Sequence, residues 1–460
     1  MKKQIFSSLI LLVILTSLVF ADGGMIIHRP DGWQLHPEER QLCAINYENG
    51  YQNMILSINF DSDTKGGDKA VWIFPIPAKP EDTVVDVIKG FPQFYGYDIK
   101  QQAKNKISNN FQMMRATQIY PLFLTRNIMY AAKSFEQQVG GIMDNARAKE
   151  PSMYIYEHIE KMGLTTELVR VKDGKVLEDY FKAKSLVIPS DAKKVFDEYI
   201  GNDYIFVISW IYDLEKLKQE QANYEKMPYY GSQTNLVGVS LTFPTDKIYF
   251  PLKPTSIYGS KSVPATIYVT GYVTPVLYDS IKSSTQVEYL YQGYYSVPEN
   301  INTLFSGKAQ IDNLKYTKIT MNPPSKYLKE DLYFENKAPA VIRRAEFFIN
   351  YSKTLGWSFF IICSILASLI AALIAFRKDA KLLTFTLFGL TNILTIIGVI
   401  VGIIILKTKE IDQKLKDQIK KAGVAITMWD KRKLLFVILF SIIFMILTII
   451  LEKVILTSLN

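Results

Sequence analysis

Apolar residues gather at the two ends of this chain of 460 residues, and the stretch between them has the patterning of a globular domain. The N-terminus reads MKK, continues through apolar residues over 9–20, and places Val19 and Ala21 at the positions that a signal peptidase reads. A basic start, an apolar run and small residues at the end are typical of a secretory signal peptide. We therefore predict a signal peptide over 1–21, cut after Ala21; the alternative is an uncleaved anchor helix.

Three apolar runs without a charged residue close the chain. They cover 355–376, 382–406 and 434–451, which is 22, 25 and 18 residues. At about 1.5 Å per residue, each is long enough to cross a hydrocarbon core of roughly 30 Å. The sequence therefore predicts a three-helix transmembrane bundle. With the signal peptide it also predicts a multi-pass plasma-membrane protein whose large N-terminal domain lies outside the cytoplasm.

The segment 407–433 between the second and third runs carries nine Lys or Arg residues against four acidic ones. Its apolar positions Ile411, Leu415 and Ile419 recur every four residues, which predicts a short basic amphipathic helix. Such a helix lies on an anionic membrane surface or serves as a solvated connector. Alternating spans place this loop outside and the basic 377–381 turn inside, so only the turn follows the positive-inside rule.

The region before the runs is rich in strand signals. Two β-rich stretches over 41–60 meet at Asn49-Gly50, a pair that favours a tight hairpin because both residues tolerate positive φ. The sequence AVWIFPIPAKPE predicts a strand that its prolines end or place at an edge. Further along, strand, turn, strand and helix are predicted over 154–184, a helix over 123–145, and a last β section from position 236.

These patterns predict the α+β class, strand-rich with short helices. We expect an exported α+β domain over 22–275, and a β-rich section with a juxtamembrane neck over 276–354. The formal charge of +9 is no sign of nucleic-acid binding, because more than half of the basic surplus lies in 407–433, where lipid headgroups are the expected partner. Of the two cysteines, Cys363 lies in an apolar run and Cys43 is expected as a small buried strand residue, so no disulfide is predicted.

Residues with catalytic or metal-binding spacing are scarce. The three histidines are His28, His36 and His158, and none stands in an HExxH or CxxC-linked pattern. His28 and His36 are expected as polar loop residues rather than metal ligands. No Walker loop, GxSxG elbow or GxGxxG after a strand occurs. We therefore predict no catalytic, cofactor or metal residue, although paired carboxylates across a cleft are beyond a single sequence.

Tyrosines give the clearest binding signal. Tyr289, Tyr291, Tyr294 and Tyr295 are concentrated in EYLYQGYYS. Exposed aromatic side chains bind sugars and partner proteins, because they present rigid amphipathic area at low entropy cost. The alternative is that these tyrosines are ordinary strand residues with one wet edge. Asn350 opens an Asn-x-Ser glycosylation sequon, a pattern of low specificity.

Three segments resemble one known family in the right order. They are AVWIFPIPAKPE, the stretch from YEHIEKMGLTTELV through LEDYF to VFDEYIGNDYIFVISW, and SLTFPTDKIYFPLKPTS. Over about 25–275 they are similar to the domain of unknown function 2330 family of exported bacterial and archaeal domains. Many of its members open with Cys-Gly-Gly where this chain has Asp22-Gly23-Gly24, so a family disulfide there would be missing. The resemblance implies export and fold kinship, and it implies no activity.

The leading hypothesis is a non-enzymatic envelope or surface protein, anchored in the lipid bilayer, that binds another envelope protein or a polysaccharide through its aromatic-rich domain. A membrane-tethered hydrolase acting on extracellular polymer is the first alternative. It would need a pocket lined by paired carboxylates, or by His28 and His36 together. The second alternative is an accessory subunit of a membrane complex, for which Gly389, Gly398 and Gly402 offer a small-residue face.

Overall fold

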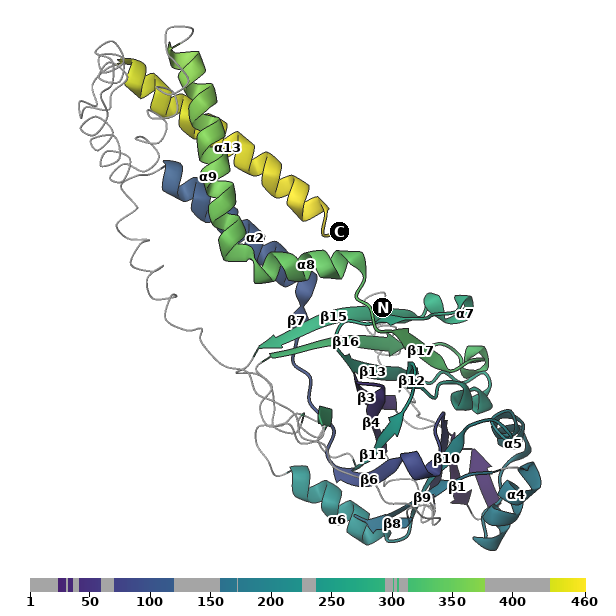
Figure 1. The fold of residues 1–460 in the computed structure, drawn as a ribbon. Helices are drawn as coiled ribbons and strands as arrows, with labels where there is room; N and C mark the ends of the chain where they lie inside the picture. The colour runs from purple at the N-terminus through teal and green to yellow at the C-terminus, as the bar shows by residue number, and fades with distance from the viewer. Residues whose placement is uncertain are drawn as a thin grey trace, which may run out of the picture. The chain divides into compact units, whose positions relative to one another are not determined.

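The computed structural model describes residues 24–29, 32–35, 41–58, 70–119, 158–171, 173–225, 237–293, 301, 304–305, 313–376 and 431–460. The chain forms two compact units (Figure 1). Unit 1 comprises Met1–Asp98 and Lys149–Pro339, and unit 2 comprises Ile99–Ala148 and Ala340–Asn460. Strands and short helices make up the described part of unit 1 and long helices that of unit 2, so the predicted α+β class is confirmed.

Unit 1 contains a six-stranded sheet in which every neighbouring pair is antiparallel. Its strands, in spatial order, are β2 (Gly32–Leu35), β1 (Gly24–Arg29), β5 (Ala70–Ile76), β10 (Ile205–Ile211), β9 (Leu164–Val169) and β8 (His158–Lys161). β1 pairs with β5 only as far as Ile73, whereas β10 continues to Ile76. Pro75 therefore lies where β5 has one neighbour, which is where a residue without an N–H is tolerated.

A second, eight-stranded sheet contains one parallel pair, β3 with β13. Its order is β6 (Val84–Lys89), β11 (Val237–Pro244), β4 (Tyr51–Ile58), β3 (Gln41–Glu48), β13 (Ala265–Thr270), β16 (Asn313–Met321), β15 (Thr285–Gly293) and β7 (Tyr97–Asp98). The β3–β4 turn has Asn49 at φ 54° and Gly50 at φ 82°, as the Asn-Gly pair predicts. A small third sheet joins β12 (Ile248–Phe250), β17 (Leu332–Glu335) and β14 (Thr274–Pro275).

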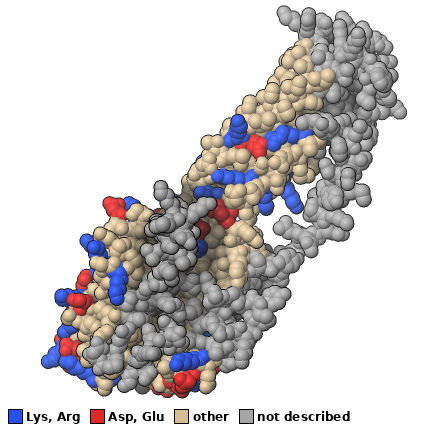
Figure 2. Space-filling view, turned by 180° about the vertical axis from the view of Figure 1, so that it is seen from behind, with Lys and Arg blue, Asp and Glu red and all other residues tan. Residues whose placement is uncertain are grey.

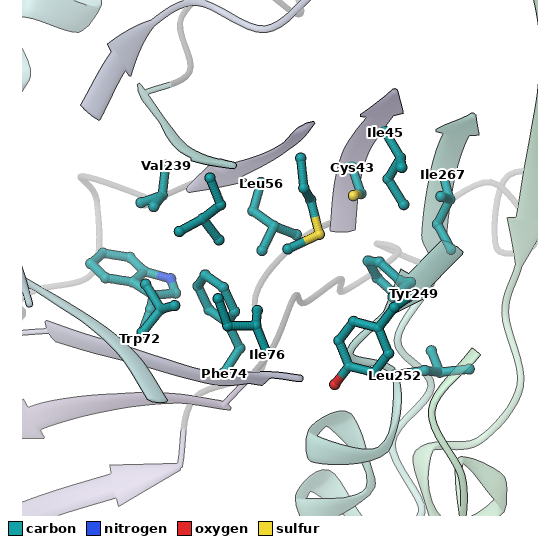
Figure 3. Close-up of a cluster of buried hydrophobic side chains, with 14 of the residues drawn as sticks. Cys43, Ile45, Leu56, Trp72, Phe74, Ile76, Val239, Tyr249, Leu252 and Ile267 are labelled. Atoms are coloured by element: carbon teal, nitrogen blue, oxygen red, sulfur yellow. The ribbon is translucent and has the colours of Figure 1, made fainter. Parts of the chain in front are cut away.

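The main core of unit 1 takes its side chains from both large sheets (Figure 3). Trp72, Phe74 and Ile76 alternate along β5, and their side chains meet those of β3, β4, β11 and β13. Cys43 is fully buried in this cluster, which confirms it as a small buried strand residue. Because β5 also buries Val71 and Ile73 in a second cluster, both faces of the six-stranded sheet are covered.

Short helices cover the outer face of the six-stranded sheet. α4 (Gly174–Ala183) and α5 (Ser190–Asp197) bury Leu177, Phe181 and Phe196 in the second cluster, together with η3 (Lys253–Tyr258). Asp173 caps α4 by accepting from the Lys175 N–H at 2.9 Å. The other short elements of the unit are α6 (Leu214–Glu225), α7 (Asp279–Lys282), η1 (Pro80–Asp82) and η6 (Ser325–Tyr327).

Unit 2 is built from four described helices: α2 (Ile99–Ile119), α8 (Ala340–Asn350), α9 (Ser352–Phe376) and α13 (Lys431–Thr457). On α2, Asn110 Nδ2 donates to the Ser352 carbonyl at the start of α9 (3.1 Å). Ser108 and Arg115 of α2 contact the Glu452 carboxylate, near the end of α13, at 2.8 and 2.7 Å. The start of α9 and the end of α13 therefore lie beside the same stretch of α2, and the two helices run antiparallel (Figure 1).

α9 and α13 expose large apolar residues along their length. Ten of these side chains are 38–55% accessible: Ile361, Ile362, Leu366, Ile370, Leu373, Ile374, Ile438, Ile446, Ile449 and Ile450. The buried residues of α9 are small: Cys363, Ser364, Ala367, Ser368, Ala371 and Ala372. α9 and α13 are each long and apolar enough to cross a membrane, yet only 33% and 22% of their most apolar windows are buried.

Two predicted boundaries are wrong. The proposed division between 275 and 276 falls inside one sheet, because β13 pairs with β16 along six residues and β15 pairs with β16 along nine. Residues 99–119 were expected in the exported domain and instead form α2 of unit 2. The neck is helical over α8, but the chain turns at Tyr351 and α9 sets off in a new direction (Figure 1).

Several other predictions fall outside the described residues. These are the signal peptide over 1–21, the helix over 123–145, the apolar run 382–406 and nearly all of the basic segment 407–433. Of the three predicted spans, the first and third correspond to α9 and α13. α13 continues past position 451 to Thr457. It therefore includes Glu452 and Lys453, which the predicted run excluded because it was limited to residues without charge.

Candidate functional site

Tyr289 and Tyr291 lie on β15, near one edge of the eight-stranded sheet. Both are half-buried and share a face, while Leu290 and Gln292 between and after them are buried on the other. Burial raises the pKa of the Tyr289 phenol, against a hydrogen bond with Thr274 that lowers it. Its ring also packs edge-on against Tyr272, with centroids 6.1 Å apart. Tyr289 is therefore held mainly by the protein, and Tyr291 is nearer the edge.

A third tyrosine, which the sequence analysis did not single out, stands beside this pair. β7 is the edge strand next to β15, and its register places Tyr97 directly opposite Tyr291. Residues opposite each other on paired strands point to the same face. Tyr97 is 70% exposed, the highest value among the exposed large apolar residues of the described chain. We name Tyr97, Tyr289 and Tyr291 together the tyrosine strip.

Two hydrogen bonds hold the backbone directly before Tyr97 in place. The Gly96 N–H donates to the Tyr316 hydroxyl at 2.7 Å, and the Tyr95 N–H donates to Gln292 Oε1 at 2.9 Å. A Cβ at position 96 would come within 2.6 Å of that hydroxyl, so only glycine fits this approach. Tyr316 in turn packs in a cluster of rings with Phe94 and Tyr268. The tyrosine strip is thus presented on a firmly packed backbone.

The remaining predicted site residues are dispersed. Tyr294, Tyr295, the cleavage residue Ala21 and His36 lie outside the described residues. Asn350 is the last residue of α8 and is exposed, so its side chain is accessible. His28 is exposed on β1 and packs edge-on against Trp33, with ring centroids 5.0 Å apart. Among the described residues, no group of three or more His, Cys, Asp or Glu side chains is placed to hold a metal ion.

A buried carboxylate forms a polar centre that sequence reasoning missed. Asp331 accepts from the Tyr199 hydroxyl at 3.0 Å, the Tyr249 hydroxyl at 3.1 Å and the Lys253 N–H at 3.0 Å. Tyr249 is fully buried, and its hydroxyl also lies 3.2 Å from the Pro75 carbonyl. Burial raises the pKa of the Asp331 carboxyl, against these three hydrogen bonds, which lower it.

The Asp331 centre joins four parts of the fold. They are the turn that follows α5 (Tyr199), strand β12 (Tyr249), the start of η3 (Lys253) and the residue directly before β17 (Asp331). Each oxygen of its carboxylate has two partners within 3.1 Å, so its hydrogen-bonding capacity is used by the protein itself. A catalytic carboxylate must lie within hydrogen-bond distance of a substrate, and an oxygen that is already bonded within the protein is not placed for this. We therefore interpret the centre as a structural link, and only its three-dimensional convergence could have revealed it.

A second polar group lies at the outer strands β8 and β9. The Glu167 carboxylate accepts from the Tyr180 hydroxyl, from Lys184 Nζ at 3.0 Å and from His158 Nδ1 at 2.7 Å. Lys184 Nζ also lies 4.0 Å from the centroid of the Trp210 ring, a cation–π distance. The hydrogen bond to Glu167 raises the pKa of His158 above its ordinary value, and Glu160 adds to that effect. The group ties α4 to the edge of the six-stranded sheet.

Comparisons with known proteins add little to this geometry. Comparison with known protein families gives no match, and comparison with curated proteins gives none either. One solved structure, described as a mutated baculovirus P35 after caspase cleavage, is similar at 10% sequence identity. The similarity covers 64% of this chain and 99% of that chain, with a TM-score of 0.25. At that score it supports neither a shared fold nor a shared function.

The Asp331 centre predicts that the loss of one hydroxyl group, that of Tyr249, lowers the stability of the fold. Tyr249→Phe leaves the ring in place and removes a buried donor to Asp331, so unfolding should become easier by about 1–3 kcal/mol. Tyr51→Phe, at a tyrosine that is 52% exposed, is the matched control and should change stability little. Thermal unfolding of the purified full chain in detergent measures both. Equal effects of the two substitutions would show that the Tyr249 hydroxyl has no special role.

The His158 group predicts a pH dependence. Because its folded pKa is raised, the protonated His158 stabilises the fold below the ordinary value of 6.5, and this contribution is lost as pH rises through the folded pKa. Glu167→Gln should bring the pKa of His158 down toward 6.5, and Glu160→Gln should lower it less. Histidine-selective NMR, with His158→Gln to assign the signal, measures each value. A larger fall in the Glu160 variant would contradict the role of Glu167.

Proposed function

We propose that this chain is a membrane-anchored protein whose β-rich unit 1 lies outside the cytoplasm and binds another envelope component through the tyrosine strip. The observation that carries the anchoring is the inverted side-chain distribution of α9 and α13. Large apolar residues face outward along both helices, and small residues face inward on α9. A core helix of a water-soluble protein shows the opposite pattern.

Lipid is the surrounding that makes this distribution favourable. Contiguous apolar patches larger than a few hundred Å² are rare on soluble monomers. Helices in a bilayer associate through close packing of small residues, because lipid tails are as apolar as leucine. Ser364, Ala367, Ser368 and Ala371 form such a face at helical spacing on α9. In the view of Figure 2, charged side chains lie on the nearer part of the long helices, and the described surface beyond them shows none.

The outward position of unit 1 is part of the same proposal. It rests on the signal-peptide pattern over 1–21 and on the resemblance of 25–275 to the domain of unknown function 2330 family, an exported family. The binding role rests on the exposure of Tyr97 and its pairing with Tyr291. A rigid aromatic surface of this kind suits a sugar ring or an apolar patch on a protein, so the partner class is an envelope polysaccharide or envelope protein.

The anchoring is tested by placing charge on the outward helix faces. Ile370→Lys combined with Ile446→Lys puts one lysine on each helix, where each costs about 2.5–3.5 kcal/mol near the bilayer centre. The parent chain should stay in the membrane pellet after alkaline carbonate extraction, and the double variant should move largely to the supernatant. Val187→Lys, at an exposed residue of unit 1, is the control and should behave as the parent. Release of the parent chain itself would refute anchoring.

The binding role is tested at Tyr97 and Tyr291. Membranes carrying the parent chain should bind isolated envelope fragments or purified envelope polysaccharide. Tyr97→Ser with Tyr291→Ser should weaken that binding at least about tenfold, which corresponds to roughly 1.4 kcal/mol lost from two central aromatic contacts. Tyr212→Ser, at another partly exposed tyrosine, should leave it unchanged. Unaltered binding by the double variant would locate the partner surface elsewhere.

A further inference from the structure

We infer that α9 and α13 form a two-span hairpin, with the C-terminal residue Asn460 on the same side of the membrane as unit 1. The chain between Phe376 and Lys431 then begins and ends on the opposite, cytoplasmic side. This inference rests on the proposed anchoring, and its geometric basis is the antiparallel course of the two helices. Three alternating spans would require α9 and α13 to run parallel.

The antiparallel course is fixed by contacts at one end of unit 2. Asn110 binds the Ser352 carbonyl at the first residue of α9, and the neighbouring Ser108 binds Glu452, eight residues before the C-terminus. Lys104, one turn earlier on α2, donates to Asn460 Oδ1 at 2.5 Å. Further along the helices the Phe360 and Phe444 rings pack edge-on, 6.2 Å apart. One face of α2 thus contacts the start of one span and the end of the other.

The direction of the helices places the end of α9 and the start of α13 on one side of the membrane. α9 leads away from the Ser352 end and α13 returns to it, so Phe376 and Lys431 both lie at the far end of the hairpin. Three alternating spans would instead place these two residues on opposite sides of the membrane.

The charges at the two ends of the hairpin support this orientation independently. Arg377 and Lys378 directly follow α9, and α13 opens with Lys431, Arg432 and Lys433. The far end therefore carries basic residues on both helices, as the positive-inside rule requires of a cytoplasmic end. At the near end, Lys353 and Lys453 are accompanied by Glu346 and Glu452, and Glu452 forms an ion pair with Arg115, with side-chain exposures of 13% and 19%. The conflict with the positive-inside rule that three alternating spans create is removed.

Aromatic side chains mark the near end as a membrane–water boundary. Trp357 is 66% exposed, Tyr351 54% and Phe347 48%, all within about three turns of the start of α9. Tryptophan and tyrosine are enriched where the chain passes the headgroup region, since their rings are apolar and their N–H or O–H groups are polar. The near end of α9 thus has the composition of an interface, whereas its next three turns expose isoleucine and leucine.

The experiment places single cysteines at three positions of the full chain in intact cells: Gln286→Cys in unit 1, Lys431→Cys at the start of α13, and a cysteine added after Asn460. The parent chain sets the background, because Cys43 and Cys363 are buried. A membrane-impermeant maleimide is applied before and after permeabilisation. We expect labelling at 286 and after 460 in intact cells, and at 431 only after permeabilisation. An epitope tag after Asn460, detected by antibody on intact cells, gives a second reading.

The outcomes separate this inference from the proposed function. Labelling at 286 and 431 with protection after 460 would overturn the hairpin and restore three alternating spans. Protection at 286 and after 460 with labelling at 431 would keep the hairpin and refute the outward position of unit 1. The same labelling at all three positions, before and after permeabilisation, would refute both the hairpin and the membrane crossing.

Discussion

The outward-facing isoleucines and leucines of α9 and α13 impose the constraint on which unit 2 depends. Covering a fully exposed side chain of this size with apolar surroundings is worth about 1.5–3 kcal/mol, and each helix presents a row of them. In the proposed membrane setting, lipid provides that cover from outside, so the hydrophobic effect would do little to hold the two helices together. Their association must come from close contact of small residues and from the Phe360–Phe444 packing.

Polar contacts at the helix ends therefore decide which helices meet and in which direction. A carboxylate at the end of a span is costly in an apolar surrounding unless it is paired. Glu452 obtains two partners, Ser108 and Arg115, seven residues apart on α2. Removing Arg115 would leave a poorly exposed charge without its cation, so α2 is energetically part of unit 2 although it is a polar helix. The Asn110 bond to the Ser352 carbonyl at the start of α9 adds a second polar contact at the same end of the unit.

Local chemistry made parts of this fold predictable. The β3–β4 hairpin follows from Asn49-Gly50, and α4 follows from its Asp173 cap, because each depends on residues within a few positions. Contacts between distant residues were not predictable. Asp331 meets Tyr199 across 132 positions and Tyr249 across 82, so no window of sequence contains the centre. The division at 275 failed for the same reason, since sheet pairing of β13 with β16 crosses it.

The same distinction separates the two roles of tyrosine in unit 1. The sequence alone shows that tyrosines are numerous. It does not distinguish a tyrosine whose hydroxyl is buried in the core from one whose ring is exposed at the surface. Tyr249 is fully buried and its hydroxyl serves Asp331, whereas Tyr97 is 70% exposed on an edge strand of two residues. So short a strand would leave an exposed ring mobile unless its backbone were held, which the Gly96–Tyr316 and Tyr95–Gln292 bonds accomplish. Ordering a side chain on binding costs about 0.5–1.5 kcal/mol, and backbone fixed in advance adds little to that cost. A held strand that presents an exposed ring therefore fits the proposed binding role.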